Sequence, residues 1–221
     1  MESITTSIRF IQDGGVFMYP ILIVGALGFA IAVERYIKLS VVRRANQAMW
    51  NQIHPVLANG EFDKAREMTA GDKSTVSQLL NLGLARQGAV RRRDDIEIAM
   101  EEGMMEIIPQ LEKRTSYIAL FANVATLLGL LGTIVGLIQA FTAVANANPA
   151  EKADLLSASI SVAMNTTAFG LIVAVPLLIL HAVINSRTSE IVDSLEMASV
   201  KTLNIISSTT QRHFQVTDRA A

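Results

Sequence analysis

The sequence predicts an all-α integral membrane protein, with three transmembrane helices and long helices that extend into the cytoplasm. Three stretches without a charged residue support this prediction: residues 14–33, 115–149 and 155–186. A bilayer core about 30 Å thick needs roughly 20 mostly apolar residues per helix, so each stretch is long enough to cross it. The composition agrees, because 51% of the residues are hydrophobic and the mean hydropathy is +0.38.

The first span is expected at residues 14–34, after a periplasmic segment at residues 1–13. A cleaved signal peptide is the rival interpretation, because Ala30-Ile31-Ala32 imitates a small-residue cleavage site. However, the leading segment holds two acidic residues against one arginine, whereas a signal peptide begins with basic residues and has a shorter apolar core. We therefore expect an uncleaved anchor.

Residues 35–114 are expected to form a cytoplasmic helical region. The predicted elements are a helix over 40–57, a turn at Asn59-Gly60, a short helix over 61–69, a helix from the N-cap Ser74 to 86, and a helix over 92–114. The last helix should run on into the second span, with a kink at Pro109. About 75 residues in short helices can form only a small hydrophobic core. This region is therefore expected to pack within an oligomer rather than to form an enzyme domain.

Two of these helices have apolar residues at helical spacing on one face. The residues are Val76, Leu79, Leu80 and Leu84 in the first helix, and Ile96, Met100, Met104, Ile107 and Leu111 in the second. This spacing predicts that both faces are buried.

The second and third spans, at 115–145 and 157–186, form a hairpin around a periplasmic loop at 146–156. Gly132 and Gly136 form a GxxxG motif, which permits close helix approach. Ser157, Ser161 and Asn165 form a polar stripe with a spacing of four residues.

Two threonines of the hairpin are expected at one depth in the membrane. With a rise of 1.5 Å per residue, Thr133 lies roughly 18 Å below Ala145, and Thr167 lies roughly 15 Å below Ser157. A single threonine often bonds only to its own helix. Several polar side chains at matched depth are more typical of an ion path or of contact with another polar helix.

Charge sets the expected orientation. Thirteen of the 19 lysines and arginines lie between Arg35 and Arg114, and four lie in the tail at 187–221. By the positive-inside rule these regions are cytoplasmic, and the N-terminus is periplasmic.

The charge of the chain also bears on its function class. Proteins that bind nucleic acid usually carry a strongly basic domain, whereas the formal net charge of this chain is −1, so we expect no nucleic acid as partner. The three histidines are far apart in sequence and no phosphate-binding loop is present, so an enzyme is not expected.

The motifs GLLGTIVGLIQAF and NTTAFGLIVAVPLLI resemble the paired signatures of the MotA/TolQ/ExbB family of ion-driven motor subunits of the bacterial inner membrane. Pro20 in the first span and Glu34-Arg35 at its inner end fit the same order. The size and the three spans are most similar to the ExbB/TolQ branch.

The resemblance implies a homopentamer in the lipid bilayer around a dimer of a single-span ExbD/TolR-like partner, whose transmembrane Asp carries H⁺ or Na⁺. No cofactor is implied. A partner carboxylate fits this chain, since no Asp or Glu lies inside its spans. The residues expected along the ion path are Thr133, Thr166, Thr167, Asn165 and Ser161. The residues expected at helix packing contacts are Gly129, Gly132, Gly136, Gly170 and Pro176.

One departure bears on the ion. The ExbB/TolQ pattern has a glutamate five residues before Thr167, where this chain has Val162. The pair Thr166-Thr167 is instead similar to sodium-type stators, and neutral oxygens can replace the hydration shell of Na⁺, which favours Na⁺.

A passive membrane scaffold or a transporter permease component is the alternative function. Either alternative would lack the Asp-bearing single-span partner that a motor subunit needs. The sequence does not indicate what the motor drives.

Overall fold

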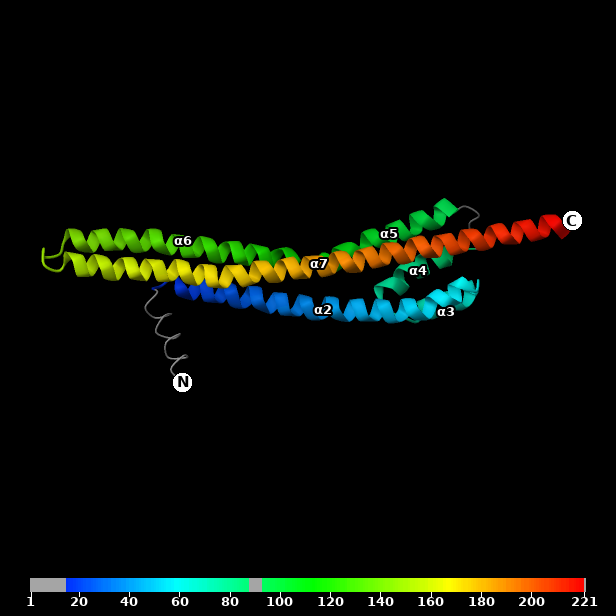
Figure 1. Ribbon diagram of the computed structural model, residues 1–221, viewed down its shortest axis with the longest axis horizontal. Helices are drawn as coiled ribbons and strands as arrows, with labels where there is room; N and C mark the ends of the chain where they lie inside the picture. The colour runs from blue at the N-terminus through cyan, green and yellow to red at the C-terminus, as the bar shows by residue number, and fades with distance from the viewer. Residues whose placement is uncertain (1–14, 88–92, 221) are drawn as a thin grey trace, which may run out of the picture. The chain divides into compact units, whose positions relative to one another are not determined.

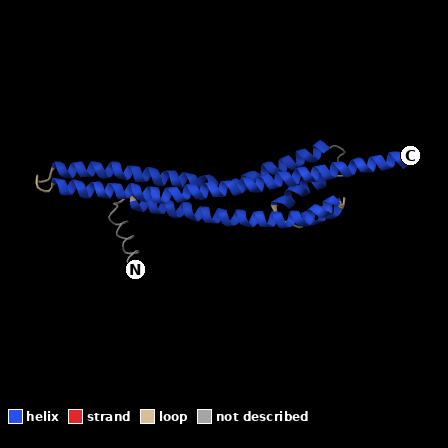
Figure 2. Ribbon diagram, in the orientation of Figure 1, coloured by secondary structure: helices blue, strands red, loops and turns tan. Residues whose placement is uncertain are grey.

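The computed structural model describes residues 15–87 and 93–220, with the side chains up to residue 209. The elements are α2 (Met18–Ala58), α3 (Phe62–Ala70), α4 (Thr75–Arg86), α5 (Arg93–Glu112), α6 (Thr115–Ala145) and α7 (Lys152–Ala220). Figure 2 shows helices and short loops, with no strand in the described part of the chain. Three helical stretches are long and apolar enough to cross a membrane. The predicted all-α class is confirmed; the predicted segment at 1–13 lies outside the described residues.

The chain divides into two compact units. We call the first the apolar unit, formed by Met1–Arg35 and Arg114–Ile184, and the second the polar unit, formed by Tyr36–Lys113 and Asn185–Ala221. The borders fall where charged residues first follow the charge-free stretches. Both α2 and α7 run through a border without interruption, α2 over 41 residues and α7 over 69. The helix expected over 40–57 is therefore the second half of α2.

In the apolar unit, α6 and α7 lie side by side, and the first half of α2 packs on α7 (Figure 1). Glycines make these contacts close: a Cβ atom on Gly25 of α2 would lie 2.7 Å from Val173 Cγ1. A Cβ atom on Gly170 of α7 would lie 2.7 Å from the Ala125 carbonyl oxygen of α6. Small residues allow helix backbones to approach without an intervening side chain.

In the polar unit, α4 packs against both α3 and α5. The apolar faces predicted for α4 and α5 are buried, which confirms that prediction. The predicted N-cap is also confirmed, because Ser74 Oγ accepts a hydrogen bond from the Ser77 amide at 3.3 Å. A second polar contact at this helix start was not predicted: Asn46 of α2 is buried, and its Oδ1 accepts hydrogen bonds from the Thr75 hydroxyl and the Val76 amide.

The prediction of one helix from 92 into the second span is wrong at a single point. The helix breaks at Lys113-Arg114, and Pro109 lies inside α5. Arg114 has φ 65°, a left-handed conformation that a right-handed helix cannot include and that few non-glycine residues adopt. Within the apolar unit Arg114 is held by an ion pair with Glu34, at 3.2 Å. The backbone conformation of one arginine thus separates α5 from α6.

Candidate functional site

Thr166 is the most buried of the three threonines of the predicted ion path, at 2% exposure. It lies opposite Gly132: a Cβ atom on that glycine would come 2.4 Å from Thr166 Cγ2. The Thr166 hydroxyl donates a hydrogen bond to the Val162 carbonyl of its own helix, at 3.0 Å. Thr166 therefore fills the space left by a glycine between α6 and α7, and its hydroxyl bonds to a carbonyl of its own helix.

Thr167 connects the two helices of the hairpin. Its hydroxyl donates a hydrogen bond to the Gly129 carbonyl of α6 at 2.8 Å, and the residue is only partly buried. Gly129 makes this possible, because a Cβ atom there would lie 3.3 Å from the Thr167 Cα. The hydroxyl thus joins α7 to α6 at the edge of their contact, where a third helix can still reach it.

Thr133 is partly exposed on α6, and its hydroxyl donates to the Leu130 carbonyl at 2.6 Å. It follows Gly129 by four residues, which is one helical turn, or about 6 Å along the axis. However, the Thr133 and Thr167 hydroxyls donate to the carbonyls of the consecutive residues Leu130 and Gly129, so the two hydroxyls lie at nearly one level of the hairpin. This arrangement agrees with the depth calculated from the sequence.

Sequence reasoning missed Thr126, which precedes Thr133 by seven residues on α6. Residues seven apart share a helix face, so Thr126 extends the face of Thr133 by two turns. Its hydroxyl donates to the Ala122 carbonyl at 3.1 Å. The spacing was available in the sequence, and a search of the second span for hydroxyls at helical repeats would have found this residue.

Ser161 and Asn165 lie on another face of α7. Asn165 precedes Thr167 by two residues, and two residues turn an α-helix by about 200°. Ser161 is exposed and Asn165 is partly exposed. Ser161 and Asn165 are four residues apart and share one face of α7, whereas Thr167 lies on the opposite face. One ion path lined by all five predicted residues does not fit this arrangement.

The four glycines predicted at packing contacts all lie between α6 and α7 of the same chain. Gly129 faces Gly170, Gly132 faces Thr166, and a Cβ atom on Gly136 would lie 2.9 Å from Ala163 Cβ. Pro176 lies inside α7, next to the fully buried Leu177, whose side chain packs on Gly28. The GxxxG motif is therefore used within the chain, and contacts between chains require other surfaces.

The three apolar spans contain few ionisable side chains. The charge-free stretches contain no Asp, Glu, Lys or Arg, and their one histidine, His181, lies five residues before the end of the third stretch. In the described part of the chain, no group of three His, Cys, Asp or Glu residues is placed to hold a metal ion. Around Thr133 and Thr167 the two spans therefore offer hydroxyl and carbonyl oxygens and no carboxylate.

The outer surface of the apolar unit is strongly apolar. Large side chains of α6 and α7 are more than half exposed, among them Leu127, Ile138, Phe141, Met164 and Ile172. Such extensive exposure of apolar groups is typical of a surface covered by lipid or by other helices.

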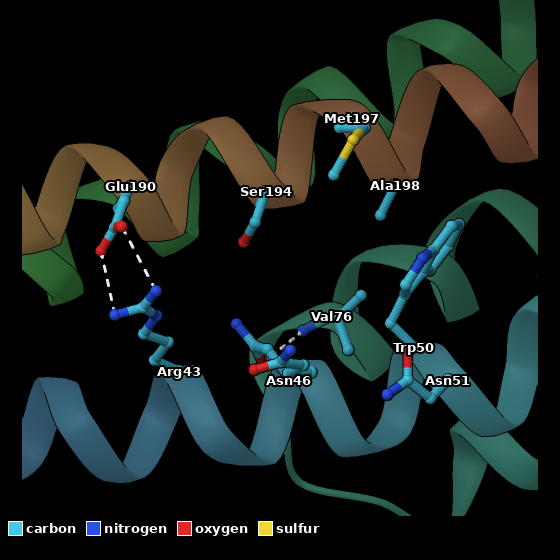
Figure 3. Close-up of a pocket in the computed structure, with 10 residues that line it drawn as sticks. Arg43, Asn46, Trp50, Asn51, Val76, Glu190, Ser194, Met197 and Ala198 are labelled. Carbon is cyan, nitrogen blue, oxygen red and sulfur yellow. Dashed lines mark hydrogen bonds and ion pairs between the residues drawn. The ribbon is translucent and has the colours of Figure 1, made fainter.

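The polar unit contains a separate cavity of about 280 Å³ between α2 and α7 (Figure 3). Arg43 pairs with Glu190 at one end, at 3.2 Å. Trp50 and Met197 lie toward the other end. The lining contains no nucleophile with an adjacent base, so it does not indicate catalysis.

Comparisons of the sequence with known proteins point to one family. The sequence model of the MotA/TolQ/ExbB proton channel family matches residues 72–197. The chain is 29% identical over 198 residues to a putative biopolymer transport protein ExbB homolog of Methanothermobacter thermautotrophicus, covering 87% of this chain and 67% of that one.

Two further relatives have related names. An ExbB-like 3 putative biopolymer transport protein of Synechocystis is 24% identical over 78% of this chain and 82% of its own length. The biopolymer transport protein exbB1 of Vibrio cholerae is 44% identical over 59 residues, which cover 27% of this chain and 26% of that protein.

Proposed function

This chain belongs to the MotA/TolQ/ExbB proton channel family, as a multi-pass membrane protein, and we propose that it is the channel subunit of an ion-driven motor. One observation carries the proposal: Thr133 and Thr167 lie at nearly one level of two neighbouring spans that contain no Asp or Glu. A hydroxyl pair at membrane depth can line a path for an ion that another subunit carries.

The proposed complex contains five copies of this chain around two copies of a single-span, ExbD/TolR-like partner with a transmembrane Asp. Thr133 and Thr167 would face the partner helices near that Asp. Ion flow through this interface would drive work in the periplasm or at the outer membrane. The role is transport and mechanical coupling rather than catalysis.

We propose an inner-membrane topology that follows the charges. The membrane segments are residues 14–34, 115–145 and 157–186; residues 1–13 and 146–156 face the periplasm, and residues 35–114 and 187–221 face the cytoplasm. The thirteen lysines and arginines between Arg35 and Arg114 support this orientation.

The burial of Thr166 bears on the choice of ion. The expectation of Na⁺ required oxygens from Thr133, Thr166 and Thr167 together, but Thr166 is buried against Gly132 and bonded within its helix. Two partly exposed hydroxyls are a poor replacement for a Na⁺ hydration shell. We therefore propose that the partner Asp carries H⁺ and that the threonines orient water around it.

The test is ion flux through the complex of this chain with its single-span partner, reconstituted in proteoliposomes. A proton gradient should drive acidification of the lumen when Na⁺ is replaced by K⁺ at constant pH and membrane potential. The same complex with the partner Asp changed to Asn should be inactive. Flux that collapses without Na⁺ would contradict the choice of H⁺. Failure to associate with any Asp-bearing partner would favour a passive scaffold instead.

A further inference from the structure

The polar unit holds a second cavity, of about 510 Å³, that the proposed ion path does not use. Its walls come from the first residues of α2 in this unit and from Arg187 of α7. Three of the lining side chains are arginines, Arg43, Arg44 and Arg187, and none is acidic. The cavity is therefore a basic pocket built from two helices.

Arg187 is held in a fixed orientation by neutral groups. Its two terminal nitrogens donate hydrogen bonds to Ser40 Oγ and to the Tyr36 hydroxyl, both at 3.0 Å. Its guanidinium carbon also lies 4.3 Å from the centre of the Tyr36 ring, a cation–π contact. Ser40 in turn donates to the Tyr36 carbonyl, at 2.7 Å. These contacts orient the guanidinium without cancelling its charge.

The three arginines differ in how their charges are compensated. Arg43 forms an ion pair with Glu190, visible in Figure 3. By contrast, Arg44 and Arg187 form no ion pair with any of the described residues. Within the described part of the chain, two positive charges at one cavity therefore have no acidic partner. Guanidinium groups match the oxygens of a phosphate better than any other cationic side chain.

The pocket lies at the ends of the first and third charge-free stretches, which is the level expected for lipid headgroups. Tyr36 directly follows Glu34-Arg35 at the end of the first charge-free stretch, and Arg187 directly follows the end of the third. Tyrosine and arginine are enriched at this level of a membrane protein. Beside the arginines, Ile37 and Val41 also line the pocket and are 56% and 61% exposed. Because they are four residues apart, they form a short apolar strip on one face of α2.

We propose that this pocket binds the phosphate of an anionic phospholipid, such as phosphatidylglycerol. Arg187 and Arg44 hold the phosphate oxygens, and the Ile37–Val41 strip contacts the start of the acyl chains. The apolar strip and the position at the span ends favour a lipid over a free phosphate ion. The inference depends on insertion of the chain in a membrane and not on ion transport, so it can fail independently of the proposed function.

The experiment is native mass spectrometry of the full-length protein, in the complex it forms in detergent, titrated with defined lipids. Phosphatidylglycerol should be retained in preference to phosphatidylcholine, and inorganic phosphate should not displace it. The double variant Arg44→Gln/Arg187→Gln should retain phosphatidylglycerol at least about tenfold more weakly, since charged hydrogen bonds are lost. Arg86→Gln, which removes an exposed, paired arginine of the same unit, is the matched control and should bind as the unchanged protein does.

A second variant protects the test against misfolding. Arg44 makes no hydrogen bond or ion pair with a described residue, so Arg44→Gln alone should leave the fold intact and still weaken retention. Three results would overturn the proposal: equal retention of both lipids, displacement by inorganic phosphate, or unchanged lipid binding with loss of association between copies of the chain. The second would indicate a free phosphate site, and the third would indicate a protein interface.

Discussion

Thr133, Thr166 and Thr167 carry the same hydroxyl, but their surroundings assign them different roles. Thr166 is packed against Gly132, Thr167 bonds across to Gly129, and Thr133 bonds within its own helix while staying partly exposed. A hydroxyl that only stabilises packing should respond to substitution through stability. A hydroxyl that lines an ion path should respond through flux.

We therefore predict different outcomes for valine substitutions, which keep the shape but remove the hydroxyl. Thr133→Val should reduce ion flux while leaving expression and assembly unchanged. Thr167→Val should reduce flux and also lower stability by about 1 kcal/mol, because the bond to Gly129 is lost. Thr142→Val is the control, because Thr142 is exposed on the same helix and donates to Ile138 in the same way. Ion flux in proteoliposomes measures the effect on transport, and thermal melting in detergent measures the effect on stability. Unchanged flux in the double variant Thr133→Val/Thr167→Val would show that neither hydroxyl lines the ion path.

Gly132 gives a second prediction at this scale. Gly132→Ala should destabilise the chain by about 1–3 kcal/mol, because the new Cβ meets Thr166 Cγ2. Adding Thr166→Ser removes that methyl group and should restore part of the stability. Gly71→Ala is the control, since the nearest atom to its Cβ is 3.9 Å away. Thermal melting in detergent measures all three; an equal loss in both glycine variants would contradict the contact.

At the scale of elements, the start of α4 depends on a small polar cluster. The Asp72 carboxylate accepts hydrogen bonds from the Ser74 hydroxyl and from the Ser74 amide, and these lower its pKa below the ordinary value of 3.8. Ser74 in turn caps α4, and Asn46 of α2 binds its first turn. These hydrogen bonds therefore stabilise the folded state as long as the Asp72 carboxylate is ionised.

This lowered pKa predicts how stability varies with pH. Since the folded pKa lies below the unfolded one, the stabilisation is fully present above pH 3.8 and is lost as the pH falls through the folded pKa. Asp72→Asn should weaken amide protection in α4 at neutral pH, and the difference from the unchanged protein should shrink at lower pH. Hydrogen exchange measures this. Glu67→Gln, on the exposed face of α3, is the control; a difference that stays constant with pH would contradict the role of the carboxylate.

On the scale of the whole molecule, the glycine contacts limit how copies can assemble. Gly132 and Gly136 face α7 of their own chain, so a ring needs other surfaces of the hairpin. The exposed apolar side chains of α6 and α7 provide such a surface. The glycines pack α6 closely on α7 within each chain, and in the proposed ring several of these hairpins enclose the partner helices.

We predict that the purified complex contains five copies of this 23.9 kDa chain. Native mass spectrometry after gentle release from detergent measures the number directly. Phe141→Ala, which shortens a highly exposed side chain of α6, should weaken the ring more than it changes the melting of the isolated chain. A stable monomer in the presence of the partner would rule out the ring.

The sequence by itself determined the helical class, the three long apolar stretches, the buried faces of α4 and α5, and the cap at Ser74. Each depends on composition, charge or spacing along one helix, which the order of residues sets directly. The family could also be identified from two motifs of the hairpin. The break at Arg114 could not be predicted, because nothing local demands a left-handed arginine.

Only the tertiary structure decided which hydroxyls share a surface. Helical spacing places residues on faces of one helix, but the direction of each face depends on which neighbour packs there. The contacts of Gly129 and Gly132 with α7 bury Thr166, leave Thr167 at the edge, and separate both from Ser161 and Asn165. The pocket around Arg187 likewise joins residues about 150 positions apart. Only the packing of α7 on α2 brings these residues together.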